Sequence, residues 1–323
     1  MEKNLVSILI PVYNRANIVS DSIESALNQT YKNIEIIIVD NCSTDETWNI
    51  LTQYALLDGR IQIFRNEKNI GPVRNWISCV EKAKGEFSKI LWSDDIMHES
   101  FIEKALPFLK NHDVGFVYSQ ASIFSGINQT SATDILFRSF PNSGTYNSLI
   151  FINGIYSTAT FEGKFPYSPG CALFRTDSIR KNLILNFPNK YHVDFSKEAI
   201  GNDLMLFLLT ASDYPKFGYI NECLNYFRAH AGSISTNSSS KLELIYLLSK
   251  AIFFDKTAID LDQSSIRNFN SYLMYAFCGG TNILGEKSLK SFYKSNTYKL
   301  NTSLYLKLKC KKFINYLQFT NNS

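Results

Sequence analysis

The sequence is poor in features that mark several other classes of protein. No apolar run reaches the roughly 20 residues that a membrane-spanning helix needs, and no signal-peptide core follows Met1. None of the six cysteines forms a C-x-x-C pair. We therefore expect reduced cysteines and a cytoplasmic protein. The chain of 323 residues is 45% hydrophobic and only 19% charged, which excludes a chain that is disordered by composition.

Acidic residues are absent from the C-terminal end of the chain. Residues 287–323 hold eight lysines and no Arg, Asp or Glu, so subtracting these eight charges from the net charge of +4 leaves −4 on residues 1–286. A basic end favours an anionic surface as its partner. In 300–323 the lysines alternate with Leu, Ile, Tyr and Phe. This pattern predicts either an anchor on an anionic membrane surface or a terminal helix packed on the body. Nucleic acid is not expected as a partner, because the body is acidic.

Five apolar runs mark strands in the first part of the chain. They are continuous and rich in β-branched residues, as is typical of strands buried on both faces of a parallel sheet. They cover 6–12, 34–39, 60–64, 87–92 and 114–118. Helical patterns lie between them, with apolar faces within 73–80 and 102–109. The spacing of Ser43 and Glu46 matches a capping box and predicts a helix from there through Leu57. The alternation predicts a doubly wound α/β fold.

The rest of the chain divides into two further parts. Residues 120–200 are rich in Ser, Asn, Gly and aromatics, which predicts loops and short strands that cover a site, and 203–211 predict a buried helix. After a polar break at 237–240 the pattern is helical to the end. We therefore expect three parts, at 1–119, 120–237 and 238–323.

Polar residues follow three of the predicted strands where those strands end. They are Tyr13, Asn14 and Arg15 after the first, Asp40, Asn41, Ser43 and Asp45 after the second, and Ser93, Asp94 and Asp95 after the fourth. Pro11, near the end of the first strand, accompanies them. Because the carboxyl ends of parallel strands share one edge of a sheet, we expect these residues to converge on one crevice. An acid there can accept hydrogen bonds from a base or ribose, and two adjacent acids can hold Mg²⁺ or Mn²⁺ that bridges phosphates.

Six segments, in chain order, resemble the signatures of family 2 glycosyltransferases. They are 6–15, 37–45, Asn69-x-Gly71-x-x-Arg74-Asn75 with Ala83-x-Gly85, Ser93-Asp94-Asp95, Gly201-Asn202-Asp203, and 227–235. The resemblance spans about two thirds of the chain. It implies a GT-A-like fold, which is a mostly parallel twisted sheet flanked by helices, here with a C-terminal helical extension. It also implies inverting transfer of a sugar from a nucleotide diphosphate sugar, typically a UDP-sugar, to an acceptor hydroxyl.

The resemblance also implies roles for individual residues. Asp203 is the expected general base, Asp40 binds the nucleotide base, and Asp94 or Asp95 holds Mn²⁺ or Mg²⁺ with help from His230. The residues expected to contact the donor are Pro11, Tyr13, Asn14, Arg15, Asp40, Ser43, Asp45, Gly71, Arg74, Asn75, Ser93 and Asp94. Arg74 and Asn75 are expected to lie off the apolar face of their helix, and Trp76 in the core.

Two positions depart from the family pattern. Trp92 stands where the first acid of the metal motif usually lies, and Asn202 stands where an acid often precedes the base. Which acid holds the metal therefore stays open. Residues 1–119 are expected to bind the nucleotide sugar, 120–237 to bind the acceptor and supply catalysis, and 238–323 to form helices.

Other functions remain as alternatives. A nicotinamide oxidoreductase would need G-x-G-x-x-G after its first strand, and a nucleotidyltransferase would usually show a Gly-rich basic loop there, where this chain has Pro-Val-Tyr-Asn. A nucleotidyltransferase and a non-catalytic nucleotide-sugar-binding protein are the alternatives kept. The expected acceptor is a saccharide or a lipid-linked molecule of bacterial surface-polysaccharide synthesis, with the enzyme at the inner face of the cell membrane if 300–323 binds there.

Overall fold

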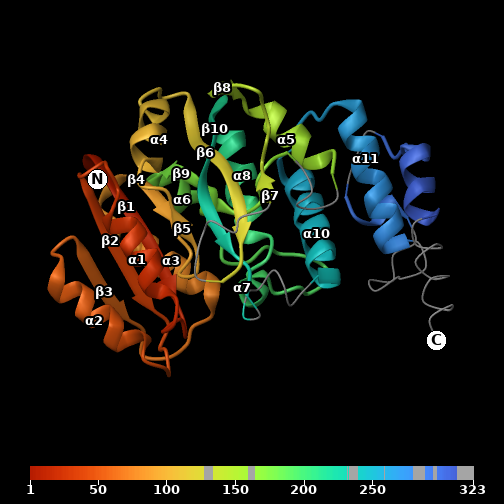
Figure 1. Ribbon diagram of the computed structural model, residues 1–323. Helices are drawn as coiled ribbons and strands as arrows, with labels where there is room; N and C mark the ends of the chain where they lie inside the picture. Colours follow the sequence, from red (N-terminus) through yellow and green to blue (C-terminus); the bar gives the residue numbers. More distant parts are fainter. Residues whose placement is uncertain are drawn as a thin grey trace.

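The structure, a computed structural model, describes residues 1–126, 134–158, 164–230, 232, 239–257, 259–278, 288–293 and 297–310. A ten-stranded sheet runs through the middle of this part of the chain, with helices on both faces (Figure 1). The strand order is β3-β2-β1-β4-β9-β6-β10-β5, with β7 beside β6 and β8 beside β10. The prediction of a mostly parallel sheet flanked by helices is confirmed.

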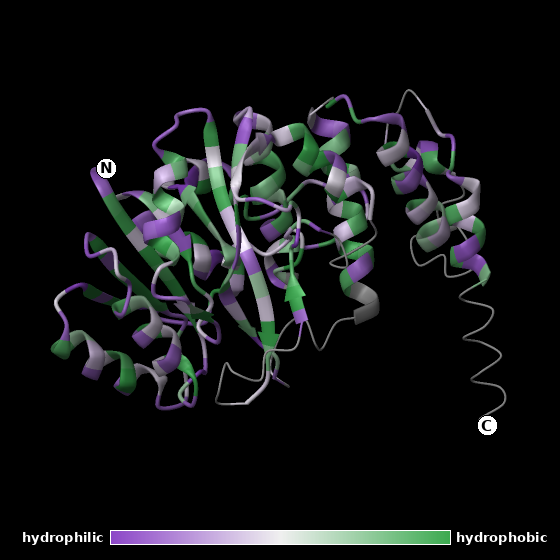
Figure 2. Cartoon of the chain, turned by 45° about the horizontal axis from the view of Figure 1, so that its top comes forward, coloured by the Kyte–Doolittle hydropathy of each residue, from purple (hydrophilic) through white to green (hydrophobic). Residues whose placement is uncertain are grey.

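The first half of the sheet is parallel and follows the predicted runs closely. Its strands are β1 (Glu2–Val12), β2 (Ile34–Asp40), β3 (Ile61–Arg65) and β4 (Gly85–Ile90). The helices are α1 (Val19–Leu27), α2 (Thr47–Leu57), α3 (Pro72–Lys82) and α4 (Phe101–Leu109). Ile8 and Ile36 belong to one apolar core, whereas Leu9 and Ile37 belong to another. Because alternate side chains of these strands enter two different cores, the runs are mostly apolar (Figure 2). Ser7 and Glu35 interrupt them, and the Ser7 hydroxyl donates to the Glu35 carboxylate.

The register of these strands brings the predicted site residues to one edge. Val12 on β1 lies opposite Asp40 on β2, and Leu9 on β1 lies opposite Ile90 on β4. The three strands therefore end close together, and the residues that follow them meet at the same edge of the sheet.

The second half of the sheet contains both parallel and antiparallel strand pairs. β9 (Ala172–Arg175) lies antiparallel between β4 and β6 (Val114–Phe124), and β10 (Lys216–Arg228) runs parallel to β6. The short strands are β5 (Ile96–Met97), β7 (Asp134–Leu136) and β8 (Gly144–Asn147). β6 is longer than the predicted run 114–118, because it pairs with β10 as far as Phe124 opposite Arg228. This pairing carries Arg228 to the edge where β1, β2 and β4 end.

The region 120–200 is more helical than expected. It contains α5 (Ser148–Tyr156), α6 (Thr176–Asn182), α7 (Phe195–Glu198) and the short 3-10 turn η2 (Pro169–Cys171). The prediction of loops and short strands there was therefore wrong for α5 and α6. Each helix is under three turns long, too short for a clear period in the sequence, and packing supplies most of its stability. α8 (Asn202–Asp213) confirms the predicted buried helix, with nine buried residues.

The C-terminal region is helical, as expected, in the part that is described. It holds α10 (Ser239–Thr257), α11 (Gln263–Leu273), the π-turn η3 (Met274–Cys278), the 3-10 turn η4 (Leu289–Ser291) and a helical stretch over 302–310. α10 packs against α8, and α11 against α5 (Figure 1). Residues 311–323 of the expected basic anchor lie outside the described residues. Within the described ranges, no helix is both long enough and apolar enough to cross a membrane.

Candidate active site

Asp40 ends β2 as a fully buried carboxylate. Its oxygens accept hydrogen bonds from the backbone N–H of Ser43 at 3.1 and 3.2 Å and from the Ser43 hydroxyl. Nε of Arg65 lies 3.1 Å from Oδ2 of Asp40. The carboxylate is therefore held by the protein itself, and Arg65 is a partner that the sequence analysis did not identify.

The predicted capping box at 43–46 does not form. The Ser43 hydroxyl donates to Asp40 instead of capping a helix, and α2 begins only at Thr47. Oδ1 of Asp45 accepts the Thr47 N–H at 3.0 Å and Oδ2 accepts the Ala16 N–H at 3.1 Å. Partial burial raises the pKa of Asp45, but the hydrogen bonds from Thr47 and Ala16 outweigh it, and the net pKa lies below its ordinary value.

The loop after β1 is tied to the loop after β2. Asn14 has a left-handed backbone with φ 52°, a conformation that Asn adopts more readily than most residues. Its N–H donates to Oγ of Ser43 at 2.9 Å, and its side-chain oxygen accepts the Thr44 N–H at 2.9 Å. The Arg15 N–H donates to Oγ1 of Thr47 at 2.8 Å. Tyr13, between these contacts and the strand, is 40% exposed.

Four asparagines form a network behind this edge that the sequence analysis largely missed. The Asn41 side chain donates to Oδ1 of Asn69 at 2.9 Å and accepts from Asn66 at 3.1 Å. Asn66 also donates to Oδ1 of Asn75 at 2.9 Å, and Asn75 donates to the Val39 carbonyl at 3.0 Å. The expectation that Asn75 lies on the polar side of its helix is wrong, because it is buried and both of its polar groups are paired inside the protein.

The start of α3 is fixed by Gly71. This residue has φ 85°, in the left-handed region that glycine adopts at little cost, and its N–H donates to Oδ1 of Asn69 at 2.9 Å. Arg74 follows on α3 with an exposed side chain. Trp76 is in the core, as expected, and packs on Trp92 with ring centroids 4.7 Å apart.

Asp94 faces two basic side chains. Nε2 of His230 lies 2.8 Å from Oδ2 of Asp94, and Nε of Arg15 lies 3.9 Å from the same oxygen. The Arg15 and Asp94 side chains are 23% and 17% exposed. The structure therefore brings together residues that follow β1, β4 and β10. The residues after His230 in the predicted 227–235 segment, except Gly232, lie outside the described residues.

Asp95 points the other way, into the protein. It is 6% exposed, and Oδ1 accepts the backbone N–H of Arg228 at 3.0 Å. Burial, and then the adjacent charge of Asp94, raises the pKa of Asp95, while the Arg228 N–H and the charges of Lys89 and Arg228 oppose the rise. Ser93, beside this pair, is also buried.

Arg228 links the loop after β4 to α1 and to the segment just after β6. Its Nε donates to the Asp94 carbonyl at 3.0 Å, and its guanidinium pairs with Asp21 on α1 and donates to the Gly126 carbonyl. The Arg228 side chain is only 5% exposed. Its role is therefore to fix the loop that carries Asp94 and Asp95.

The described side chains could supply only part of the coordination shell of a metal ion. Within the ranges that the structure describes, no three His, Cys, Asp or Glu side chains cluster closely enough to hold an ion. Asp94 and His230 are the two side chains that converge at this edge. A cation here would need its remaining ligands from a bound phosphate or water, as Mg²⁺ commonly does.

Asp203 lies at the first turn of α8 and is 7% exposed. Oδ1 accepts the N–H groups of Gly201 at 2.9 Å and Leu204 at 2.8 Å, and Oδ2 accepts the Tyr246 hydroxyl at 2.5 Å. Burial raises the pKa of Asp203 to about 6, and the hydrogen bonds from Tyr246, Leu204 and Gly201 oppose the rise. A carboxyl with such a pKa can be ionised at neutral pH and can still accept a proton, as a general base must.

Asn202, where an acid often stands in the family, has a structural role. Its amide donates to the carbonyls of Ile184 at 2.7 Å and Leu185 at 3.0 Å. It is fully buried. It therefore ties the start of α8 to the segment after α6 and keeps the neighbouring Asp203 in place.

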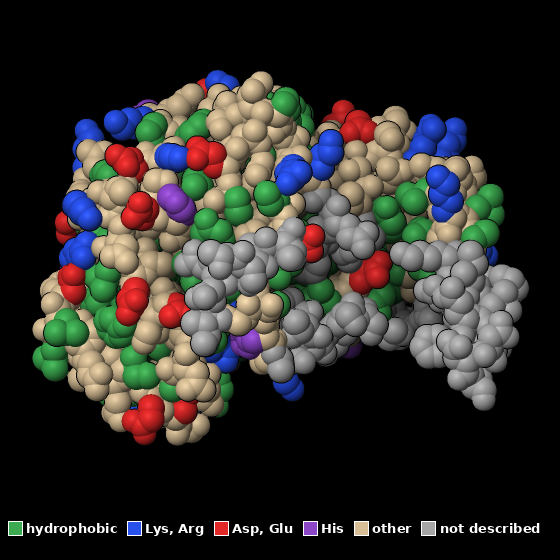
Figure 3. Space-filling view, in the orientation of Figure 1, with side chains coloured by type: hydrophobic (Ala, Val, Ile, Leu, Met, Phe, Trp, Pro, Cys, Tyr) green, Lys and Arg blue, Asp and Glu red, His purple; other side chains and the backbone are tan. Residues whose placement is uncertain are grey.

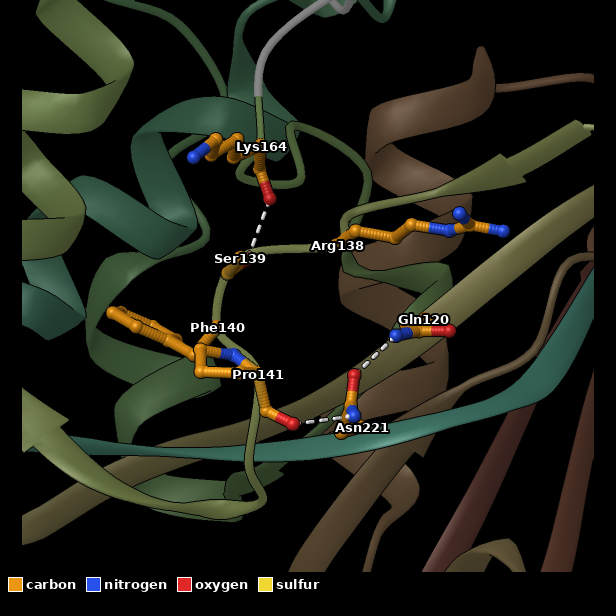
Figure 4. A pocket seen from close by; sticks show the side chains of 7 residues that line it. All are labelled: Gln120, Arg138, Ser139, Phe140, Pro141, Lys164 and Asn221. Carbon is orange, nitrogen blue, oxygen red and sulfur yellow. Dashed lines mark hydrogen bonds between the residues drawn. The ribbon is translucent and has the colours of Figure 1, made fainter.

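A cavity of about 540 Å³ opens in the second half of the chain, between β6, β10 and the segments around 139 and 164. It is lined by Gln120, Arg138, Ser139, Phe140, Pro141, Lys164 and Asn221 (Figure 4). The Gln120 amide donates to Oδ1 of Asn221, whose own amide donates to the Pro141 carbonyl.

On the face of the molecule shown in Figure 3, acidic and basic side chains are interspersed.

Comparisons with known proteins identify the family of the chain. The family model described as glycosyl transferase family 2 matches residues 7–183. The Escherichia coli enzyme UDP-Glc:alpha-D-GlcNAc-diphosphoundecaprenol beta-1,3-glucosyltransferase WfaP is 34% identical over 241 residues, which cover 74% of this chain and 82% of WfaP.

Solved structures show the fold. Residues 1–349 of S. aureus TarS in complex with UDP-GlcNAc superpose with a TM-score of 0.63 at 18% identity, covering 88% of this chain and 77% of that one. The UDP complex of the same TarS fragment gives a TM-score of 0.60 at 18% identity over 88% and 76% of the two chains. The predicted GT-A-like α/β fold is thereby confirmed. With the match to the family model and the similarity to WfaP, these findings show that the chain belongs to glycosyl transferase family 2 and is a glycosyltransferase.

Proposed function

We propose that the protein transfers a sugar from a UDP-sugar to a hydroxyl of a saccharide or lipid-linked acceptor in surface-polysaccharide synthesis, with inversion at the anomeric carbon. The observation that carries the proposal is the buried Asp203 with its raised pKa in the same fold that presents Asp94, His230 and Arg15 at one sheet edge. The name of WfaP, with a UDP-sugar donor and a diphosphoundecaprenol acceptor, supports the choice of substrates.

The donor would lie along the edge where β1, β2 and β4 end. Tyr13, Arg15, Asp45, Arg74 and Asp94 keep part or all of their side chains accessible and would contact it directly. The buried members of the predicted set would shape the site from behind. They are Pro11, Asp40, Ser43, Asn75 and Ser93. Asn14 and Gly71 would set the backbone of the two loops.

Asp94 and His230 fit a divalent cation better than Asp95 does. Asp94 is partly exposed and its Oδ2 faces Nε2 of His230, whereas the Asp95 carboxylate is buried and accepts the Arg228 N–H. A carboxylate such as Asp94 suits Mn²⁺ or Mg²⁺. When bound, such an ion would offset the negative charge that develops on the departing diphosphate.

The side chains of this protein would do the rest of the chemistry. Asp203 would take the proton from the acceptor hydroxyl, so that the oxygen attacks the anomeric carbon from the side opposite the diphosphate. Arg15, a permanent cation 3.9 Å from Asp94, would pair with the diphosphate. No covalent bond to the protein forms in this single displacement.

The cavity beside β6 and β10 would take part of the acceptor. Its amides and Phe140 offer hydrogen bonds and an apolar face, which is the combination that sugars need, and its walls belong to the half expected to bind the acceptor. Arg138 extends away from Lys164 in Figure 4, so the two cations would contact different parts of a bound molecule.

Product analysis tests the proposal. Incubation with UDP-sugars and candidate saccharide acceptors should release UDP and a glycosylated product. Release of inorganic diphosphate would instead indicate a nucleotidyltransferase. Tight UDP-sugar binding without turnover on any acceptor would indicate a non-catalytic binder.

The basic end of the chain would place the enzyme at the inner membrane face. Lys307 and Lys309 are exposed on the helical stretch 302–310, and Leu306 is 60% exposed. Such a basic and apolar mixture suits an anionic lipid surface. The half-buried Leu304 and Leu308 support the packed-helix alternative for the described part.

A further inference from the structure

A hydroxyl from the C-terminal region contacts the candidate base. The Tyr246 hydroxyl on α10 donates to Oδ2 of Asp203 at 2.5 Å, although the residues are 43 positions apart. Tyr246 is 3% exposed and Asp203 is 7% exposed. The match to the family model ends at residue 183, so this contact comes from a part of the chain outside it.

The ring of Tyr246 has little freedom to move. It packs edge-on against Tyr167, with centroids 5.0 Å apart and planes at 67°. α10 itself packs along α8, the helix that Asp203 begins. Because both the ring and the helix are held by packing, the direction of the hydroxyl is fixed by the fold.

The two oxygens of Asp203 are held in different ways. Oδ1 is bound by two backbone N–H groups of its own helix start, from Gly201 and Leu204. Oδ2 receives a side-chain donor, Tyr246. An ionised carboxylate oxygen can accept more than one hydrogen bond, so Oδ2 retains the capacity to accept a second donor.

We propose that Tyr246 is a positioning residue for the general base: its hydroxyl orients Oδ2 of Asp203 and favours the ionised carboxylate. This inference rests on the proposed role of Asp203. It assigns a positioning task to α10 of the C-terminal helical region, which packs on α8.

The hydrogen bond from Tyr246 is one of the contacts that oppose the rise in the pKa of Asp203, and the titratable groups nearby act on that pKa in other ways. Burial raises the pKa of Asp203 and the Tyr246 hydrogen bond opposes it. Among the described residues, Tyr167 also faces Asp203, and burial raises its pKa so that it is neutral at physiological pH. Among the described residues of α10, Lys250 and Glu243 are, besides Tyr246, the titratable groups next to Tyr167. Burial lowers the pKa of Lys250 well below its ordinary value, and its Nζ donates to the carbonyls of Ile155 and Thr158.

Tyr246→Phe tests the inference, with Tyr156→Phe as the matched control. Tyr156 is also fully buried, also packs on α10, and its hydroxyl donates to the Lys250 carbonyl rather than to Asp203. Each variant loses one buried hydroxyl at α10: that of Tyr246 belongs to α10, and that of Tyr156 on α5 contacts it. Both should therefore show a similar fall in melting temperature.

Only Tyr246→Phe should move the pH profile. Removing a donor from a carboxylate raises its pKa, so the acid limb of kcat/KM should shift upward by about one pH unit, since a hydrogen bond to a charged group is of that size. Near pH 6 the variant should lose roughly fivefold in kcat/KM relative to wild type, and close to tenfold near pH 5, with almost no loss at pH 8. UDP affinity, measured by calorimetry, should not change.

The outcomes distinguish a failure of the role proposed for Tyr246 from a failure of the role proposed for Asp203. An unshifted profile in Tyr246→Phe, or an equal shift in Tyr156→Phe, would overturn the positioning role while leaving Asp203 as base. Full activity in Asp203→Asn would overturn the base assignment itself. Loss of all activity in Tyr246→Phe at every pH, with an unchanged melting temperature and UDP affinity, would mean that the hydroxyl acts otherwise than through the pKa of Asp203.

Discussion

Nε2 of His230 lies 2.8 Å from Oδ2 of Asp94, although the two residues are 136 positions apart in the chain. Asp94 follows β4 and His230 follows β10, and the two strands are brought to one edge by the pairing of β10 with β6 and of β6 with β9 beside β4. This pair is the point where a cation and the donor diphosphate are expected to meet.

We first predict that UDP binding depends on a divalent cation. Titration of UDP in the calorimeter should show at least tenfold tighter binding with Mn²⁺ than with EDTA, because a cation held by Asp94 would offset the charge of the phosphates. Asp94→Asn should abolish the difference. Asp113→Asn, which removes an exposed carboxylate paired with Lys216, is the control and should bind as wild type does. Equal affinity with Mn²⁺ and with EDTA would contradict the metal assignment.

The second prediction concerns Asp203→Asn. The variant should bind UDP and the UDP-sugar normally, since Asp203 is not among the residues proposed to contact the donor. It should lose about 10²–10⁴-fold in kcat, the usual contribution of a general base. Single-turnover kinetics and calorimetry on the same preparation measure the two effects. A kcat near that of wild type would show that another group takes the proton.

The third prediction is an acid limb in the pH profile. Because burial raises the pKa of Asp203 to about 6, the base is ionised above that pH and protonated below it. The value of kcat/KM should therefore be constant between about pH 7 and 8 and fall about tenfold per unit below pH 6. In Asp203→Asn, the residual kcat/KM should show no such fall near pH 6. A flat profile down to pH 5 in wild type would exclude Asp203 as the titrating group.

The fourth prediction is that Asp40→Ala raises the donor KM with little change in kcat. Asp40 binds Ser43 and Arg65 rather than facing reacting atoms, so its loss should disturb the nucleotide loop in ground and transition state alike. Leaving the Ser43 N–H unpaired should also lower stability by about 1–3 kcal/mol.

The matched control for Asp40 is Asp58→Ala. It also removes a carboxylate paired with an arginine, Arg60, but at the far end of α2. Its donor KM should remain that of wild type. A lower kcat with unchanged KM in Asp40→Ala would place Asp40 in the chemical step instead of in donor binding.

The fifth prediction concerns the basic end. Full-length protein should co-sediment with vesicles that contain anionic lipid at low salt, and less at high salt, because each lysine near such a surface contributes about 1 kcal/mol that salt screens. A variant lacking 300–323 should remain in the supernatant. If both proteins sediment to the same extent, the segment is a structural helix.

The sequence alone determined the elements with strong local patterns. β2 was predicted from the β-branched run 34–39, and every one of its residues is buried. α8 was predicted from its apolar residues. Residues at strand ends, such as Asp40 and Asp94, could be assigned to one edge because parallel strands must end together. The capping box at 43–46 failed because Ser43 had a stronger partner in Asp40, which no local pattern reveals.

Only the tertiary structure decided the contacts between distant parts of the chain. The insertion of β9 between β4 and β6, the four-asparagine network, the burial of Asp95 under Arg228 and the hydroxyl of Tyr246 on Asp203 all join segments without any periodic relation in sequence. Each depends on how helices and strands pack, and packing is set by the whole core at once rather than by neighbouring residues. The type of residue at the site was therefore readable in the sequence, whereas its partners, its burial and its pKa were decided by the fold.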